Sequence, residues 1–369
     1  MRLLIRTALL PLLVLTVMPP AVLAQAPPPV QVSVLQDPGG RVDWCPANGL
    51  IAFDCKSSTG YYAVYTCKPD GSDKQPVSAG LPGLPQRDVG QPVWSPDGKY
   101  LIMQVEKAEH EAVLRYSTTP GAGMFNDLWV LELATRKARP LRVVQNSPDC
   151  GVLGAHFSPD GKHLSWSEMY ERPARGGKEF GWWWLMVADV EYGKDGPTLT
   201  QVRQLQPGGP AFYECHGFSP DGSKLIYTSN ALTPGMPMRQ REDITVYDLA
   251  FDSERRLTSE GYNEHAVFRP DGQKIVFATD TDDPPRGTGR QQISGTDYWM
   301  MDPDGSHKQR LTSFNVPGSP MYTANAVVVA GLAWNRDGTA FVCYCHTGLL
   351  DTAEGMVEQV LMIKLGAAK

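Results

Sequence analysis

"FSPDGSKLIY", at residues 218–227, decides the fold because close copies of it recur along the chain. These copies share an aromatic residue, a Pro-Asp-Gly core and a short apolar run: "WSPDGKYLIM" (94–103), "FSPDGKHLSW" (157–166) and "FRPDGQKIVF" (268–277). Two more degenerate copies are "WCPANGLIAF" (44–53) and "WNRDGTAFVC" (334–343). Six copies that start 50 to 66 residues apart indicate a β-propeller or another repeat architecture.

Each copy has the chemistry of a tight turn between two strands. Pro fixes φ early in the turn, Asp accepts hydrogen bonds from amides ahead of it, and Gly tolerates a positive φ. The alternative is that Ser95, Ser158 or Ser219 is a catalytic nucleophile. However, "GFSPDG" (217–222) departs from the nucleophile-elbow pattern G-x-S-x-G, because Asp221 stands where the second Gly belongs. We therefore interpret the motif as structural.

Further short strand-like segments follow each copy. "YLIMQV" (100–105) continues the turn, "DYWMMD" (297–302) illustrates the third segment, and "RLT" (310–312) the last. Four short strands joined by turns describe one propeller blade. Six such units predict an all-β, six-bladed propeller.

The ends of the chain suggest how the ring closes. The last unit supplies strands near 327–334, 340–345 and 357–365, so its fourth strand is missing. The alternating run "VQVSVL" (30–35) has no partner of its own. We predict that it completes the sixth blade, which removes two exposed sheet edges.

With these motifs the chain resembles the six-bladed propellers of the TolB type, which are built from WD-like Ser-Pro-Asp-Gly repeats. The resemblance extends over essentially the whole chain after the N-terminal segment. The separate N-terminal α/β domain of that family has no counterpart here, so the chain looks like a propeller-only relative. The resemblance implies an envelope location and a periplasmic protein partner.

The N-terminal residues have the pattern of a secretory signal peptide. Arg2 and Arg6 precede an apolar run that ends in a small-x-small cleavage pattern at residues 22–24. We expect residues 1–24 to be removed and residues 25–369 to form one monomeric propeller domain, periplasmic or secreted. No later apolar run is long enough for a membrane-spanning helix. A net charge of −6 gives no general electrostatic reason to bind nucleic acid.

Seven cysteines, an odd number, leave at least one thiol outside any intramolecular disulfide. No C-x-x-C spacing occurs, so a zinc ribbon is not predicted. Cys343 and Cys345 stand two apart on a predicted strand and are expected to face the core together. Cys150 and Cys215 precede adjacent blades and are the best candidates for a disulfide, although spacing does not establish the pairing.

Long insertions are predicted on the face opposite the Ser-Pro-Asp-Gly turns, because loops alternate between the two faces of a four-stranded blade. They lie at 106–126, 169–181, 280–296 and 313–326. Long loops on one side of a rigid scaffold are where binding usually occurs. The first strand of each blade also begins at this face and lines the central channel.

The starts of these first strands carry most of the ionisable residues. "FYECHGF" (212–218) begins blade four and "YNEHAVF" (262–268) begins blade five. When the strands are aligned on their aromatic residues, Glu214 matches Glu264 and Cys215 matches His265. The candidate ligand-binding residues at this channel mouth are Arg41, Arg87, Gln91, His156, Tyr213, Glu214, His216, Glu264 and His265.

Three histidines and two glutamates suit a divalent metal or general acid–base chemistry, with His216 and His265 as the candidate metal ligands. The alternative is that polar groups at a propeller mouth only hold water and satisfy strand ends. His156 and His216 also stand one and two residues before their aromatic residues. Strand alternation therefore predicts that one of them faces between blades.

Two functions remain open. The first is an exported binding scaffold that docks a protein, a peptide or a small ligand at the loop-rich channel mouth. The alternative is a metal-assisted lyase or hydrolase acting on an oligosaccharide or peptide. In that enzyme His216 and His265 would bind metal or act as base, Glu214 and Glu264 would orient them, and the Arg and Tyr candidates would hold an anionic substrate. Serine peptidase activity is not expected, because neither a nucleophile elbow nor a hydrolase domain is recognisable.

Overall fold

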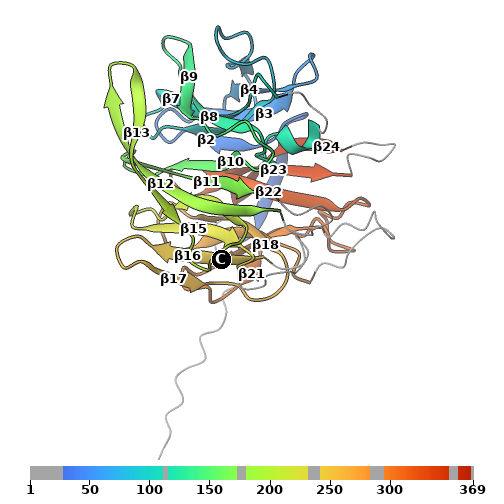
Figure 1. Cartoon of the computed structure of the whole chain (residues 1–369). Coiled ribbons are helices and arrows are strands. Elements are labelled where there is room, and N and C mark those ends of the chain that lie inside the picture. Colours follow the sequence, from blue (N-terminus) through green and yellow to red (C-terminus); the bar gives the residue numbers. More distant parts are fainter. Residues whose placement is uncertain are drawn as a thin grey trace, which may run out of the picture.

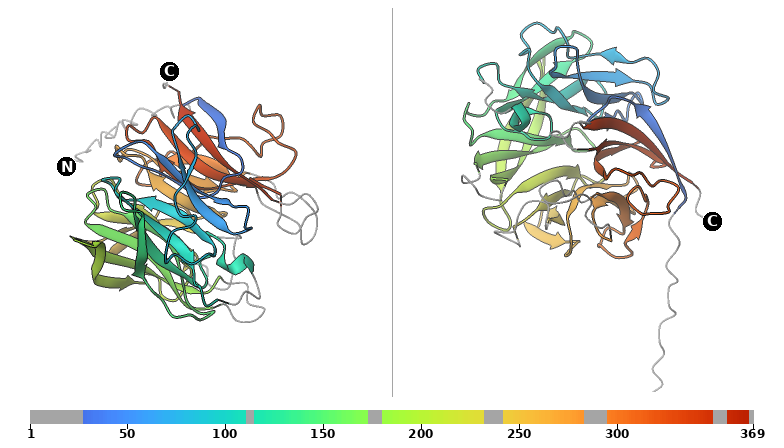
Figure 2. Two further views of the ribbon diagram at one scale, coloured as in Figure 1. Left: turned by 90° about the horizontal axis from the view of Figure 1, so that it is seen from above. Right: turned by 90° about the vertical axis from the view of Figure 1, so that its right-hand side faces the viewer.

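The computed structural model describes residues 28–110, 115–172, 180–231, 242–282, 295–348 and 356–366. The predicted signal peptide and parts of three long insertions lie outside these ranges. The described residues form six four-stranded antiparallel sheets and one short 3-10 helix, η1 (Arg115–Thr118). The predicted six-bladed propeller is thus confirmed, and Figures 1 and 2 show the sheets arranged around a common axis. No helix in these ranges has the length and apolar character needed to span a membrane.

Blades one to five each use four consecutive strands. Blade one contains β2 (Val42–Trp44), β3 (Ile51–Lys56), β4 (Tyr62–Cys67) and β5 (Gln75–Pro76). Blade two contains β6 (Val89–Trp94), β7 (Tyr100–Glu106), β8 (Asn126–Glu132) and β9 (Lys137–Arg142). Blade three contains β10 (Gly151–Phe157), β11 (His163–Glu171), β12 (Trp182–Gly193) and β13 (Gly196–Leu205). Blade four contains β14 (Tyr213–Phe218), β15 (Lys224–Ser229), β16 (Asp243–Asp248) and β17 (Ser253–Arg256). Blade five contains β18 (Asn263–Phe268), β19 (Ile275–Thr279), β20 (Asp297–Met301) and β21 (Gln309–Arg310).

Blade six joins the two ends of the chain. It contains β22 (Val327–Trp334), β23 (Ala340–Thr347) and β24 (Val357–Leu365), and its outer strand is β1 (Val30–Gln36). β1 runs antiparallel to β24, with Val30 opposite Leu365. The predicted closure by the N-terminal strand is confirmed. In Figure 2 the blue β1 lies beside the red C-terminal strands.

The hydrophobic core is divided among the six seams between neighbouring blades. One cluster joins blades three and four through Trp183 and Tyr227, and another joins blades six and one through Val342 and Phe53. Each sheet is therefore covered on both faces, and strands such as β3 are buried almost throughout. This packing explains why the strands read as apolar runs with little alternation.

The Ser-Pro-Asp-Gly motif forms the turn between the first and second strands of a blade. The Ser95 N–H donates to the Tyr100 carbonyl at 2.9 Å, and Ser95 Oγ donates to Asp97 Oδ1 at 2.6 Å. Asp97 Oδ1 also accepts the Lys99 N–H, and Gly98 has a φ of 74°. Ser158 and Ser219 make the same hydroxyl–carboxylate contact. The hydroxyl is used within the turn, in agreement with the structural interpretation.

The predicted disulfide is wrong. All seven cysteines are described, and all are free thiols. The side chain of Cys215 is buried between blades three and four, and its Sγ lies 3.2 Å from Ser165 Oγ. Cys150 packs instead on the core between blades two and three. Cys343 and Cys345 do lie together in the core between blades five and six, as predicted.

Candidate functional site

The first strands of blades two to six each contain a β-bulge just before the aromatic residue. Across each bulge, two successive paired residues are three positions apart on the first strand but only two apart on the second. The first strand therefore contains one extra residue. The register shifts fall between Gly90 and Val93, Leu153 and His156, Cys215 and Phe218, Glu264 and Val267, and Val329 and Leu332. A bulge interrupts side-chain alternation and redirects its residues.

The position of the bulge differs by one residue between blades four and five. In blade five the bulge follows Glu264, so that His265 is its first residue. In blade four it follows Cys215, so that His216 is its first residue. The flanking pairs, Glu214 with Thr228 and Glu264 with Ala278, keep the predicted match of Cys215 with His265, but Cys215 lies just before its bulge and His265 lies inside its own. The bulge of blade four lies one residue nearer to its aromatic residue than the bulge of blade five does. No residue type in the sequence indicates this shift.

The prediction from strand alternation that His156 or His216 faces between blades is wrong, because a bulge interrupts the alternation. Strand periodicity placed His156 and His216 on opposite faces, but both line the same cavity in the channel. The His156 ring lies against Gly217, where a Cβ atom would come within 3.4 Å of the ring. The extra residue of the blade-four bulge brings the two histidines to the same side.

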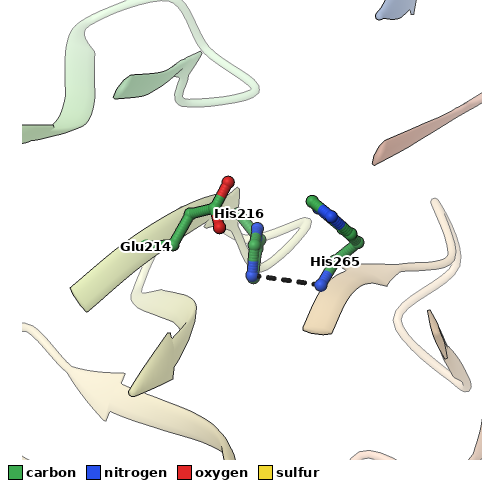
Figure 3. Close-up of side chains that lie close together, drawn as sticks. All are labelled: Glu214, His216 and His265. Carbon is green, nitrogen blue, oxygen red and sulfur yellow. Dashed lines mark hydrogen bonds between the residues drawn. The ribbon is translucent and has the colours of Figure 1, made fainter. Parts of the chain in front are cut away.

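Hydrogen bonds connect the bulges of blades two, three and five to the preceding blade. Asp54 Oδ2 accepts the Gln91 N–H at 2.9 Å, and Gln91 Oε1 accepts the Gly154 N–H at 3.2 Å. His216 Nε2 accepts the His265 N–H at 3.2 Å (Figure 3). Gln91 and His265 have φ values of 44° and 53°, which are uncommon for residues other than glycine. His216 thus has a structural role that Gln91 fills in another blade.

Three side chains from two blades form a cluster with the chemistry of a metal site. Glu214 and His216 lie on β14 and His265 lies on β18, and one potential ligand atom from each lies within 4.8 Å of the others. Figure 3 shows His216 between Glu214 and His265. Because Zn–N and Zn–O bonds are about 2.0–2.2 Å long, a small inward movement would let all three bind one ion. Imidazole nitrogen and carboxylate oxygen are suitable ligands for Zn²⁺, and carboxylate oxygen is also a suitable ligand for Mn²⁺.

Two carboxyl groups in this cluster have opposite pKa shifts. Burial and the nearby Glu264 carboxylate raise the pKa of Glu214 well above its usual value. Burial alone would raise the pKa of Glu264 as well. Its pKa is lowered instead, because the combined effect of His265, Tyr262 and Glu214 is larger than the effect of burial. Glu264 Oε2 lies 3.0 Å from His265 Nε2 and accepts the Tyr262 hydroxyl. Glu214 therefore keeps its proton to a higher pH than Glu264 does.

The buried histidines are neutral at neutral pH. Burial lowers the pKa of His156 to about 4. Burial, with contributions from His265 and His156, lowers the pKa of His216 well below its usual value. His216 Nε2 lies 2.7 Å from Thr228 Oγ1, whose hydroxyl reaches the Asn263 carbonyl at 3.4 Å.

The contacts of His216 decide which of its nitrogens could hold a metal. Nε2 is occupied by Thr228 and by the His265 N–H, so Nδ1 is the nitrogen available to an ion. While Nε2 accepts from His265, the proton of the neutral ring is on Nδ1. Metal binding therefore requires the proton to move to Nε2, where it would be donated to Thr228 Oγ1. Metal-binding histidines usually donate their other ring N–H to a carboxylate, a backbone carbonyl or a water molecule, and here the Thr228 hydroxyl would take that place.

Arg41 lies on the channel but is bound to the closing blade. Its Nη1 is 3.3 Å from Glu358 Oε1, and its guanidinium lies 4.6 Å from the centre of the Tyr344 ring. Glu358 also accepts the hydroxyl groups of Tyr62 at 2.5 Å and Tyr344 at 2.8 Å. The side chain of Arg41 is 21% exposed. We call Arg41, Tyr62, Tyr344 and Glu358 the closing cluster.

Two of the predicted site residues, Tyr213 and Arg87, have side chains that belong neither to the Glu214 cluster nor to the closing cluster. Tyr213 is fully buried, and its hydroxyl donates to the Gly209 carbonyl at 2.9 Å. Arg87 packs on the ring of Tyr61 and donates to its hydroxyl at 2.7 Å. Neither contacts the Glu214 cluster.

Sequence reasoning missed Asp54, which accepts the backbone N–H groups of both Arg41 and Gln91. Burial raises its pKa to about 7, although the Arg41 charge and these hydrogen bonds oppose the change. A signal was present, because Asp54 is an acidic residue within the apolar run "IAFDCK" (51–56). An acidic residue in a strand buried on both faces is expected to have a specific partner.

Comparisons with known proteins place the chain by fold. No protein-family model matches it. It is 27% identical over 229 residues to the uncharacterized protein Atu1656 of Agrobacterium fabrum, a match that covers 54% of this chain and 69% of that protein. TolB from Acinetobacter baumannii is 18% identical, with a TM-score of 0.49, over 89% of this chain and 64% of the TolB chain. The putative TolB from Agrobacterium tumefaciens is 21% identical, with a TM-score of 0.47, over 76% of each chain.

The chain therefore spans less than two thirds of the Acinetobacter TolB chain. At these identities the likeness concerns the fold alone, and the six sheets of this chain establish that fold by themselves. The protein shares the six-bladed propeller of TolB-type proteins. An oligogalacturonate lyase in complex with manganese is 15% identical, with a TM-score of 0.48, over 92% of this chain and 94% of that chain.

Proposed function

We propose that this protein is an exported ligand-binding propeller whose site is the channel region where Glu214, His216 and His265 converge. The supporting observation is that potential ligand atoms from two blades lie within 4.8 Å of one another. Both Glu214 and His216 are only 6% exposed. Burying ionisable groups costs free energy, and the fold does not need them, because Gln91 and Gly154 occupy the bulge in blades two and three. The cluster is therefore better explained by ligand binding than by stability.

The ligand we propose for the cluster is a divalent metal ion, with Mn²⁺ and Zn²⁺ as the first candidates. The ion would hold an oxygen of a peptide, an oligosaccharide or a partner protein at the channel mouth. Carboxylate ligands must be deprotonated, so binding would displace the proton of Glu214. The charge on the ion would offset the cost of ionising a buried carboxyl group.

The metal proposal is tested on purified protein without residues 1–24, after treatment with a chelator. Isothermal titration with Mn²⁺ and Zn²⁺ should show one site per chain. His265→Ala should weaken binding by at least about tenfold, the loss usual for a disturbed metal site. His307→Ala is the matched control, because His307 is an exposed histidine on blade five that contacts Asp302. The absence of binding by the unaltered protein at millimolar metal, or equal losses in both variants, would remove this proposal.

Export is proposed from the N-terminal pattern of Arg2, Arg6 and the apolar run that follows. We propose the periplasm as the compartment and an envelope protein, peptide or oligosaccharide as the partner. The test is to express the whole chain in a Gram-negative host and to measure the N-terminal residue of the periplasmic product. A product that begins at Gln25 would support export, whereas an intact N-terminus confined to the cytoplasm would contradict it.

A second candidate function is a metal-assisted lyase or hydrolase, and the Glu214–Glu264 pair favours it. The pKa of Glu214 is raised and the pKa of its neighbour Glu264 is lowered, and two carboxyl groups with pKa values shifted apart suit the roles of acid and base. Oligouronides and short peptides, incubated with Mn²⁺-loaded protein, would reveal unsaturated products or new amino termini. Turnover that is lost in Glu264→Gln would support the enzyme. Stoichiometric metal without turnover of either substrate class would leave the binding scaffold alone.

A further inference from the structure

A separate cavity lies in the channel toward the face that carries the Ser-Pro-Asp-Gly turns. It has a volume of about 200 Å³, and the first strands of all six blades line it. Its walls include the aromatic residues Phe268 and Trp334 and several aliphatic side chains, whereas its polar groups are Asp43, His156 and His216. Glu214 and His265 are not part of this wall. The loop-poor face therefore also has a chemically defined recess.

Asp43 is the acidic residue of this wall. Its Oδ1 accepts the Trp44 N–H at 2.9 Å, and its Oδ2 accepts the Trp94 N–H at 2.7 Å. Among the described residues no Lys, Arg or His forms an ion pair with it. A carboxylate has about four acceptor positions, so two remain after these bonds. A cation in the cavity would compensate a buried negative charge that neutral donors compensate only in part.

The other polar groups of the wall do not neutralise Asp43. Neither His156 nor His216 forms an ion pair or a hydrogen bond with Asp43 in the part of the chain that the structure describes. Burial raises the pKa of Asp43 to about 6 against the effect of its two backbone hydrogen bonds. Above that pH the wall carries one negative charge. Phe268 and Trp334 add aromatic surface to the wall, and aromatic rings attract cations at short range.

We propose that this cavity binds a small organic ammonium ion, with Asp43 as the acceptor and with Phe268 and Trp334 beside the alkyl part. A volume of 200 Å³ equals that of six or seven water molecules at about 30 Å³ each. The ligand is therefore an alkylammonium of about five to eight non-hydrogen atoms. This site is distinct from the proposed metal cluster, although His216 contacts both.

The probe is n-butylammonium, and its neutral control is n-butanol, which has the same number of non-hydrogen atoms. At pH 7.5 the unaltered protein should bind butylammonium saturably and at least about tenfold more tightly than butanol, a difference of about 1.4 kcal/mol. Titration calorimetry or ligand-observed NMR measures both constants. Equal affinities, or no binding of the amine in the millimolar range, would overturn the proposal.

Two variants locate the site. Asp43→Asn should remove the preference for the amine over the alcohol, and Val267→Phe, which fills the cavity without changing its charge, should weaken both ligands. His307→Ala should leave amine binding unchanged, because His307 is exposed on blade five and is not part of the cavity wall. If Val267→Phe folds and binds butylammonium as tightly as the unaltered protein does, the ammonium site lies elsewhere and the assignment fails.

Discussion

His216 of blade four accepts the backbone N–H of His265 of blade five through its Nε2 atom, at an N–N distance of 3.2 Å. The same two side chains, with Glu214, form the candidate metal cluster. One histidine therefore connects two blades and also contributes to the proposed site. Its two roles compete, because metal binding at Nδ1 requires a proton on Nε2.

The structural role of His216 predicts a difference between two substitutions. His216→Ala leaves the buried His265 N–H without an acceptor and should lower the free energy of unfolding by about 1–3 kcal/mol. His216→Gln should lower the free energy of unfolding by less, because the side-chain amide oxygen of Gln91 accepts the corresponding N–H, that of Gly154, in another pair of blades. Urea denaturation of the metal-free proteins measures both values. Equal losses would show that the hydrogen bond has no net effect on stability.

The protonation states of Glu214 and Glu264 predict unequal effects of the same substitution. Glu214→Gln keeps a hydrogen-bond donor where a protonated acid stood, so metal-free stability should change by less than about 1 kcal/mol. Glu264→Gln removes the carboxylate that faces His265 and Tyr262, and it should cost about 2–3 kcal/mol. The comparison is made by denaturation at pH 7.5. A larger loss for Glu214→Gln would reverse the assignment of acid and carboxylate.

Burial of His156 predicts a pH-dependent contribution to stability. Its pKa falls from 6.5 to about 4 on folding, so the unfolded chain binds the proton more strongly. This contribution to the free energy of unfolding is complete above pH 6.5 and is lost as the pH falls toward 4, by up to about 3 kcal/mol. The buried carboxyl groups Asp43 and Asp54 act in the opposite direction, because their pKa values are raised.

The effect of His156 is isolated by comparison with His156→Gln, which retains the other groups. The stability of the unaltered protein should fall more steeply than that of the variant between pH 7 and pH 4.5. The difference between the two unfolding free energies, measured at each pH, cancels the effect of the carboxyl groups. A constant difference across this range would mean that His156 keeps its ordinary pKa in the folded protein.

The closing cluster predicts a local effect on the seam between blades six and one. Glu358→Ala removes the acceptor of Tyr62 and Tyr344 and the partner of Arg41. The loss should be about 3–5 kcal/mol, as is typical when one member of a buried ion pair is removed. Hydrogen exchange should accelerate first in β24 and β1, which form the closing pair. Uniform acceleration in all blades would contradict a local role.

The sequence predicted the fold well because the deciding information is local and repeated. Pro, Asp and Gly set the turn in each copy, and the aromatic residues place the first strands in register. The closing strand was predictable because a single alternating run remained without a partner. The residues that form the closing cluster could not be predicted, because Arg41 and Glu358 are 317 residues apart in the chain.

The site was predicted only in part. His156, His216, Glu214, Glu264 and His265 were all singled out, since ionisable residues precede the aromatic residue in three blades. Their geometry depends on the bulges, and a shift of one residue changes which side chains face each other. The same limit explains the disulfide error. The blade-four bulge follows Cys215, whose side chain packs into the core between the blades, a direction that spacing does not reveal.

Crystals soaked with Zn²⁺ and measured at the zinc absorption edge test the proposed metal cluster most directly. We predict one anomalous peak about 2.0–2.2 Å from a Glu214 carboxylate oxygen, His216 Nδ1 and a ring nitrogen of His265. The His216 ring should then have lost its hydrogen bond from the His265 N–H. A soaked crystal without a peak between these three side chains, with the hydrogen bond intact, would contradict the account.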